Sequence, residues 1–203
     1  MCRRLWPAGV DTVTRIEFEW SPGRRDSRYL DNGTAADIAV FHSTPSGGSG
    51  VIFIETKYTK DMQASSYALK PRYHEVAASS RASLADAQPR VESGWLQQVW
   101  LDHLLLLVTR EVHALDSGLF VVTYPEVNTS CRAAVEAYAR VLDPAAASSF
   151  EASTLEEIVG LMEGATDAEW VRTFRRRYLD PVDAPRAGSL LPTSPSGASA
   201  PDE

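Results

Sequence analysis

Three residues, Asp37, Glu55 and Lys57, combine side-chain types and a spacing that suit the hydrolysis of a phosphodiester. Asp37 lies within an apolar stretch, and Glu55 follows four large apolar residues at 51–54, with Lys57 two positions later. Because side chains alternate along a strand, Glu55 and Lys57 should share one face of a sheet. Mg²⁺ commonly takes one or two carboxylates and completes its shell with water and phosphate oxygens. The residues therefore predict a divalent-metal site for phosphodiester chemistry.

A β-hairpin would bring these residues together, and the sequence predicts one. Alternating polar and apolar residues predict a first strand at 14–20, and a second strand is expected at 34–42. The Gly- and Ser-rich run at 44–50 predicts the hairpin loop, and the run at 51–54 predicts a buried third strand. Adjacent antiparallel strands would then place Asp37 near Glu55.

The rest of the chain alternates helices with one further strand. Helical spacing and capping residues predict the helices, and a short apolar run predicts the strand. The helices are expected at 92–110, 130–142, 153–162 and 167–178, with one or two short ones between 61 and 87, and the strand at 119–124. The predicted order along the chain is three strands, then helices, then one strand and further helices. This order fits an α/β sandwich with a mixed sheet.

The length of 203 residues, with 44% hydrophobic residues, suits one domain and is too short for two comfortable ones. We expect a single domain over residues 1–180, with a core at about 14–125 and a helical C-terminal section at 126–180. The Pro, Ser, Gly and Ala content of the remainder predicts a disordered tail at 181–203.

The spacing of the acidic residues resembles the signature of the PD-(D/E)xK nuclease superfamily. Thr34-Ala35-Ala36-Asp37, seventeen intervening residues and Glu55-Thr56-Lys57 carry this resemblance, which covers roughly residues 14–125. It implies a restriction endonuclease-like three-layer sandwich, with a central mixed sheet flanked by helices. It also implies that Asp37, Glu55 and the main-chain carbonyl of Thr56 bind Mg²⁺ or Mn²⁺, and that Lys57 positions the attacking water or supports the transition state.

Some branches of that superfamily add a glutamine from the helix after the core strands, in a QxxxY element. Gln98 occupies a similar place here and is expected to join the catalytic residues, although Asp102 stands where the tyrosine would be. Ala36 also replaces the proline of the signature. Asp102 departs from the QxxxY branch, whereas Ala36 is a substitution that the superfamily tolerates.

Other side chains could contribute to the site or serve the fold alone. In the first strand Ile16, Phe18 and Trp20 should share one side and Arg15, Glu17 and Glu19 the other. Glu17 or Glu19 could add a carboxylate to the metal cluster, and a solvated outer face explains both equally. We interpret His42 and His103 as structural, and we expect Tyr58 to pack. The four arginines Arg172, Arg175, Arg176 and Arg177 could contact phosphates or neutralise acidic neighbours.

The net charge of −7 hides a division between the two halves of the chain. Residues 1–90 carry 12 Lys and Arg against 10 Asp and Glu, whereas residues 91–203 carry 8 against 17. Four cations, Lys57, Lys60, Lys70 and Arg72, flank the proposed site. The half that holds the chemistry is therefore the half that could face phosphate.

These observations predict a Mg²⁺-dependent phosphodiester hydrolase that acts on nucleic acid, with DNA the expected substrate and RNA left open. The alternative is a catalytically inactive module of the same fold that binds nucleic acid or a protein partner, or an unrelated α/β interaction protein in which Glu55 and Lys57 form a surface ion pair. No apolar run is long enough to span a membrane, and no leader pattern opens the chain, so we expect a cytoplasmic protein. A homodimer is one option, since many nucleases that cut both strands pair two sites.

Overall fold

The structure, a computed structural model, describes residues 6, 9–58, 67–84, 87–92, 94 and 96–180. The predicted tail at 181–203 and the cation Lys60 lie outside these residues. None of the described helices is both long and apolar enough to cross a lipid bilayer.

Five strands form one mixed sheet, and their order across the sheet follows their order along the chain. The strands are β1 (Thr12–Trp20), β2 (Ala36–Ser43), β3 (Ser49–Thr56), β4 (Ser117–Tyr124) and β5 (Phe150–Thr154). The first three pair antiparallel, whereas β3 with β4 and β4 with β5 pair parallel. The predicted hairpin and the mixed sheet are therefore confirmed, and β5 is a strand that the sequence did not reveal.

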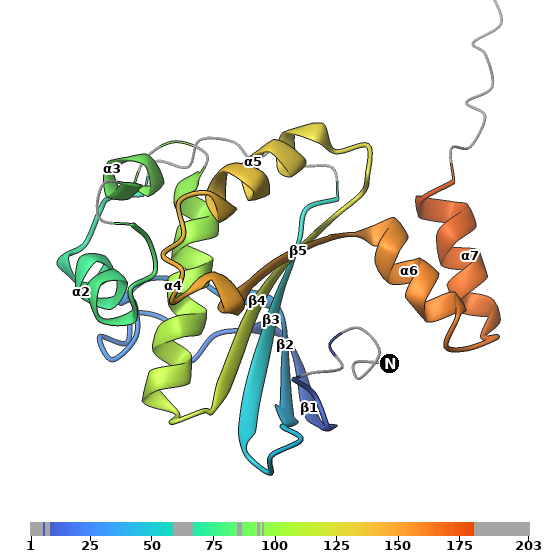
Figure 1. Ribbon diagram of the computed structural model, residues 1–203, viewed down its shortest axis with the longest axis horizontal. Helices are drawn as coiled ribbons and strands as arrows, with labels where there is room; N and C mark the ends of the chain where they lie inside the picture. Colours follow the sequence, from blue (N-terminus) through green and yellow to red (C-terminus); the bar gives the residue numbers. More distant parts are fainter. Residues whose placement is uncertain are drawn as a thin grey trace, which may run out of the picture.

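Helices flank this sheet on both sides (Figure 1). They are α2 (Pro71–Ser80), α3 (Gln88–Val91), α4 (Leu96–Val112), α5 (Thr129–Ala139), α6 (Leu155–Glu163) and α7 (Glu169–Tyr178), with a short 3₁₀ turn at Ala147–Ser149. α4 packs against β3 and β4, and α2, α3 and α5 surround it, while α6 and α7 lie beyond β5 on the other side of the sheet. This α/β architecture is consistent with the restriction endonuclease-like fold.

α4 is the central helix of the main core. Of its 17 residues, 12 are buried, and they lie on all of its sides. The reason is its position between the sheet and three other helices, and a helix enclosed in this way is apolar almost all round. The buried glutamine and histidine on α4 need hydrogen-bond partners inside the protein, since water does not reach them.

His103 meets that need with two neighbours. Ser149 Oγ donates its proton to the carbonyl of Ala146 at 2.6 Å and so accepts from His103 Nε2, at 2.8 Å. The hydroxyl of Tyr138 then donates to His103 Nδ1, also at 2.8 Å. The neutral imidazole is thus fully paired, and burial lowers the pKa of His103 to about 3. This confirms the structural role that we predicted for it.

We predict that His103 makes the fold sensitive to acid. In the unfolded chain its pKa is near 6.5, so protons bind preferentially to the unfolded state and stability falls as the pH drops from about 6.5 toward 3. The loss should reach on the order of 4–5 kcal/mol if the native state persists to the lower limit. Urea unfolding at several pH values, for the wild type and for His103→Gln, measures the difference in slope.

A second observable keeps this prediction testable if His103→Gln fails to fold. The NMR shift of the His103 ring protons in the wild type should stay constant between pH 7 and pH 5. A His103 that titrates within that interval would contradict the prediction.

β1 differs from its predicted pattern at its last residues. Ile16 and Phe18 are 52% and 73% exposed, whereas Trp20 is 8% exposed and lies in the main core against Phe41 and Phe53. Glu19, between them, has a left-handed backbone with φ of 50°. This conformation interrupts the strand alternation, so the prediction that all three apolar residues share one side is wrong.

Candidate functional site

The β2–β3 hairpin places the two predicted metal-binding carboxylates next to each other. Ile38 pairs with Ile54, so the antiparallel register continues to Asp37 opposite Glu55. Asp37 Oδ2 accepts a hydrogen bond from the N–H of Thr56 at 2.8 Å, which fixes the orientation of the carboxylate. In β1, Phe18 pairs with Ile38 and Trp20 with Ala36, so Glu19 lies across from Asp37. Three carboxylates therefore stand in a row across three strands.

Glu55 and Lys57 form a buried ion pair. Lys57 Nζ lies 2.6 Å from Glu55 Oε1, and the two residues are only 7% and 8% exposed. Burial raises the pKa of the Glu55 carboxyl, and the opposing effect of the Lys57 charge does not cancel this rise. Burial is the largest single influence on Lys57 and lowers its pKa, but the charge and hydrogen bond of Glu55, together with the charges of Asp102 and Asp37, outweigh it, so the Lys57 pKa is raised and the amine stays charged. The pair is thus unlike the surface ion pair of the alternative interpretation.

Residues from β4 and from the loop after it hold the main chain of Lys57. The N–H of Lys57 donates to the carbonyl of Thr123 at 2.8 Å, and Asn128 Nδ2 donates to the carbonyl of Lys57 at 3.1 Å. The same Asn128 side chain caps α5, where its Oδ1 accepts from the N–H of Cys131 at 3.0 Å. Sequence reasoning missed both residues, because only the parallel β3–β4 pairing brings them to the site.

We predict that Asn128 couples the cap of α5 to the position of Lys57. Asn128→Asp keeps the cap acceptor, so the unfolding free energy should change little, but it removes the donor to the Lys57 carbonyl and should slow catalysis. Asn128→Ala removes both functions and should also cost about 1 kcal/mol of stability. Thermal unfolding and cleavage rates of the two variants, measured together, distinguish these effects. Full activity in Asn128→Asp would contradict the coupling.

A cavity of about 400 Å³ opens beside the carboxylates. Its charged lining residues are Glu19, Arg24, Asp37, Glu55 and Asp102. Gln98, from α4, also lines it, and its Nε2 lies 3.5 Å from Glu55 Oε1, at the limit of a hydrogen bond. The structure therefore brings the predicted Gln98 to the same cavity as Asp37 and Glu55, with Lys57 reaching it through Glu55.

Asp102 brings a further carboxylate to this cavity, one turn after Gln98 on α4. Burial raises the pKa of the Asp102 carboxyl well above its usual range, and the negative charge of Glu55 adds to the rise. The sequence had marked Asp102 only as the residue in place of a tyrosine. Its position gives the cavity a fourth acidic group.

The donor set around the cavity suits a divalent cation. Burial favours the neutral form of Asp102, but the other three carboxylates still outnumber the two cations, Lys57 and Arg24, so the site carries surplus negative charge that such an ion would neutralise. Within the described residues no three His, Cys, Asp or Glu side chains converge closely enough to hold a metal as they stand. Mg²⁺ needs only one or two carboxylates, with water and substrate oxygens for the rest, and Asp37 and Glu55 can supply these.

Two cations that the sequence placed near phosphate have other partners. Lys70 Nζ pairs with the carboxylate of Asp31 at 2.9 Å. Arg72 donates to the carbonyls of Tyr29 and Arg28, each at 2.9 Å. Both side chains therefore hold the β1–β2 loop, and a contact of either with phosphate stays a prediction.

The remaining candidates have structural partners. Glu17 pairs with Arg15 at 3.1 Å, and the hydroxyl of Tyr58 donates to the carbonyl of Tyr178 at 2.6 Å. His42 is buried, and its Nδ1 lies 3.1 Å from the carbonyl of Ser43. On α7, Arg172 and Arg175 pair with Glu169 and Glu163, so these two arginines neutralise acidic neighbours.

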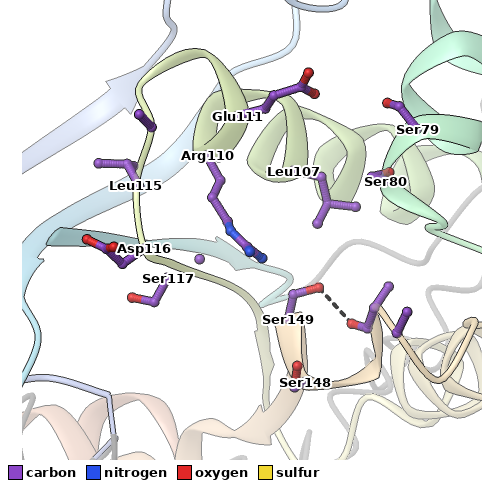
Figure 2. Close-up of a pocket in the computed structure, with 14 residues that line it drawn as sticks. Ser79, Ser80, Leu107, Arg110, Glu111, Leu115, Asp116, Ser117, Ser148 and Ser149 are labelled. Carbon is purple, nitrogen blue, oxygen red and sulfur yellow. Dashed lines mark hydrogen bonds between the residues drawn. The ribbon is translucent and has the colours of Figure 1, made fainter. Parts of the chain in front are cut away.

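A larger cavity, of about 710 Å³, lies at the C-terminal end of α4 (Figure 2). Arg110 projects into it, and Asp116 and Ser117 at the start of β4 form part of its wall. None of the residues of the predicted site lines this cavity. The larger cavity therefore lies apart from the predicted site.

The mixed sheet, its flanking helices and the carboxylates at the end of the hairpin define a protein of the restriction endonuclease-like class. A model of the PD-(D/E)XK nuclease superfamily matches residues 1–180, and the chain belongs to this superfamily. No curated protein and no solved structure matches the chain significantly.

Proposed function

We propose that this protein is a nuclease that hydrolyses phosphodiester bonds in DNA and uses Mg²⁺ or Mn²⁺ as its cofactor. The observation that carries the proposal is the buried Glu55–Lys57 pair next to Asp37, on a cavity with surplus negative charge. A charge pair is costly to bury, and a surface site would have served stability equally well. Its retention beside further carboxylates is typical of a catalytic centre.

In this proposal Asp37, Glu55 and the main-chain carbonyl of Thr56 hold the cation. When bound, a divalent ion polarises phosphate oxygens and makes water more acidic. Asp37 is already oriented by the N–H of Thr56, and Glu55 is oriented by Lys57, so the two carboxylates need little rearrangement.

Lys57 and Gln98 act on the substrate side of the reaction. Lys57 stays charged, because its pKa is raised, and can neutralise the charge that develops on the phosphoryl oxygens or position the attacking water. Gln98 lines the cavity, with its amide at the limit of a hydrogen bond to Glu55, and can orient that water by hydrogen bonding. Neither role requires a proton to leave Lys57.

Cleavage of plasmid DNA and of a single-stranded oligonucleotide tests this proposal. The purified protein should cut in Mg²⁺ or Mn²⁺ and should not cut in EDTA. DNA binding without cleavage under any metal would instead support the inactive binding module, and neither binding nor cleavage would contradict both.

A further inference from the structure

The loop between β1 and β2, residues 21–35, forms a rigid wall of the site cavity. Tyr29 and Leu30 are 4% and 1% exposed and anchor the loop in the core. Arg72 at the start of α2 binds two consecutive main-chain carbonyls of the loop. The main chain of this loop is therefore held in place beside the cavity before any ligand arrives.

Arg24 is the cation that this loop presents to the cavity. It lines the cavity and makes no ion pair or hydrogen bond with any residue that the structure describes. Lys57 is bound to Glu55, and Lys70 and Arg72 are bound to the loop itself. Among the cations that the structure describes near the site, Arg24 is thus the one left for an anionic ligand.

An aromatic ring lines the same cavity. Tyr67 is 55% exposed, so its face is available to a ligand. The side-chain amide of Gln97 fixes its main chain with two hydrogen bonds of 2.9 Å, from the N–H of Tyr67 to Oε1 and from Nε2 to the carbonyl of Tyr67. The main chain of Tyr67 is therefore held beside the cavity, and the phenol hydroxyl makes no hydrogen bond to the described part of the protein.

A cation and an aromatic face on one cavity are the two elements that bind single-stranded nucleic acid, one for the backbone and one for a base. A cavity of about 400 Å³ suits a single small ligand. One unpaired nucleotide has that scale, whereas a base that remains stacked and paired in a duplex cannot enter. We infer that the site takes an unpaired nucleotide, with its phosphate on Arg24 and its base on Tyr67. This inference rests on the proposed nuclease function.

Binding of a labelled mixed-sequence oligonucleotide, as a single strand and as a duplex, tests the inference. Ca²⁺ takes the same oxygen ligands as Mg²⁺ and serves as the metal, with fluorescence anisotropy as the readout. The wild type should bind the single strand at least about tenfold more tightly than the duplex. Arg24→Gln should weaken this binding at least about fivefold and reduce the slope of log K against log salt by about 0.7, the value for one phosphate contact to a single strand.

Matched variants separate these effects from general changes in charge or fold. Arg25→Gln removes the same charge from the adjacent position, which does not line the cavity, and should bind like the wild type. Tyr67→Ala should weaken binding at least about fivefold, whereas Tyr67→Phe keeps the ring and should restore it.

The inference and the nuclease proposal fail differently. Equal binding by Arg24→Gln and Arg25→Gln, or equal affinity for duplex and single strand, overturns the inference while metal-dependent cleavage by the wild type still stands. If the wild type neither binds nor cuts either DNA, both fail.

Discussion

Asp37→Asn should lower metal-dependent DNA cleavage at least about 10²-fold and leave the fold intact. The asparagine keeps an oxygen that can accept from the N–H of Thr56, so the hairpin end retains its hydrogen bond. The substitution removes the negative charge that helps to hold the cation. A bound cation stabilises charge in the transition state by several kcal/mol. Initial cleavage rates at saturating metal, together with circular dichroism, measure both parts of the prediction.

Asp116→Asn is the matched control for this experiment. Asp116 also accepts a main-chain N–H across the sheet, from Ser49 at 2.8 Å, but it lines the cavity at the other end. The two substitutions make the same chemical change in similar strand-end settings. Equal rates for Asp37→Asn and Asp116→Asn would remove Asp37 from the site.

Lys57→Met should destabilise the protein by about 3–5 kcal/mol, because it leaves Glu55 buried without its partner. The double variant Glu55→Gln/Lys57→Met removes both charges and should recover most of that loss. Urea unfolding of the wild type, of Lys57→Met, of Glu55→Gln and of the double variant gives the coupling free energy of the Glu55–Lys57 pair. Independent, additive effects would contradict a buried interacting pair.

The stability of Lys57→Met should depend on pH in a definite direction. Burial raises the pKa of Glu55 even in the wild type, and loss of the lysine removes the main influence that lowers it. A carboxyl with a raised folded-state pKa costs no stability at low pH and destabilises as the pH rises through that pKa. The stability difference between Lys57→Met and the wild type should therefore be largest at neutral pH and shrink in acid. A stability difference that does not change with pH would show that the buried charge of Glu55 does not cause the destabilisation of Lys57→Met.

The central hairpin could be predicted because its signals are local. Alternation, a Gly- and Ser-rich loop and a β-branched run specify β2 and β3, and the register that follows puts Asp37 opposite Glu55. β5 has only five residues, and its alternation of Phe150 and Ala152 with Glu151 and Ser153 is too short to distinguish a strand from a loop. Its pairing with β4 comes from tertiary context.

In β1, the backbone conformation of one residue explains why the predicted alternation of side chains is wrong. Period-two alternation assumes an extended backbone at every residue, and Glu19 departs from it. No residue type at that position signals the change, since glutamate seldom adopts a left-handed conformation. Trp20 therefore enters the core, whereas Ile16 and Phe18, which precede Glu19, stay exposed.

The partners of charged side chains were the least predictable part of the site. Lys70 and Arg72 are close to the motif in sequence, yet their length lets them reach the β1–β2 loop instead. Arg24 lies 13 residues before Asp37, no farther from the motif than Lys70 is from Lys57, and it comes to the cavity because the β1–β2 loop lines it. The extent of the single domain, a cytoplasmic location and a homodimer stay predictions.

The central claim is that Asp37 and Glu55 form a divalent-metal site. Calorimetric titration of Mn²⁺ into the wild type and into Asp37→Asn tests this claim most directly. We predict that the wild type binds the ion and that Asp37→Asn binds it at least about tenfold more weakly. No heat of binding in the wild type, or equal affinity in the two proteins, would contradict the site.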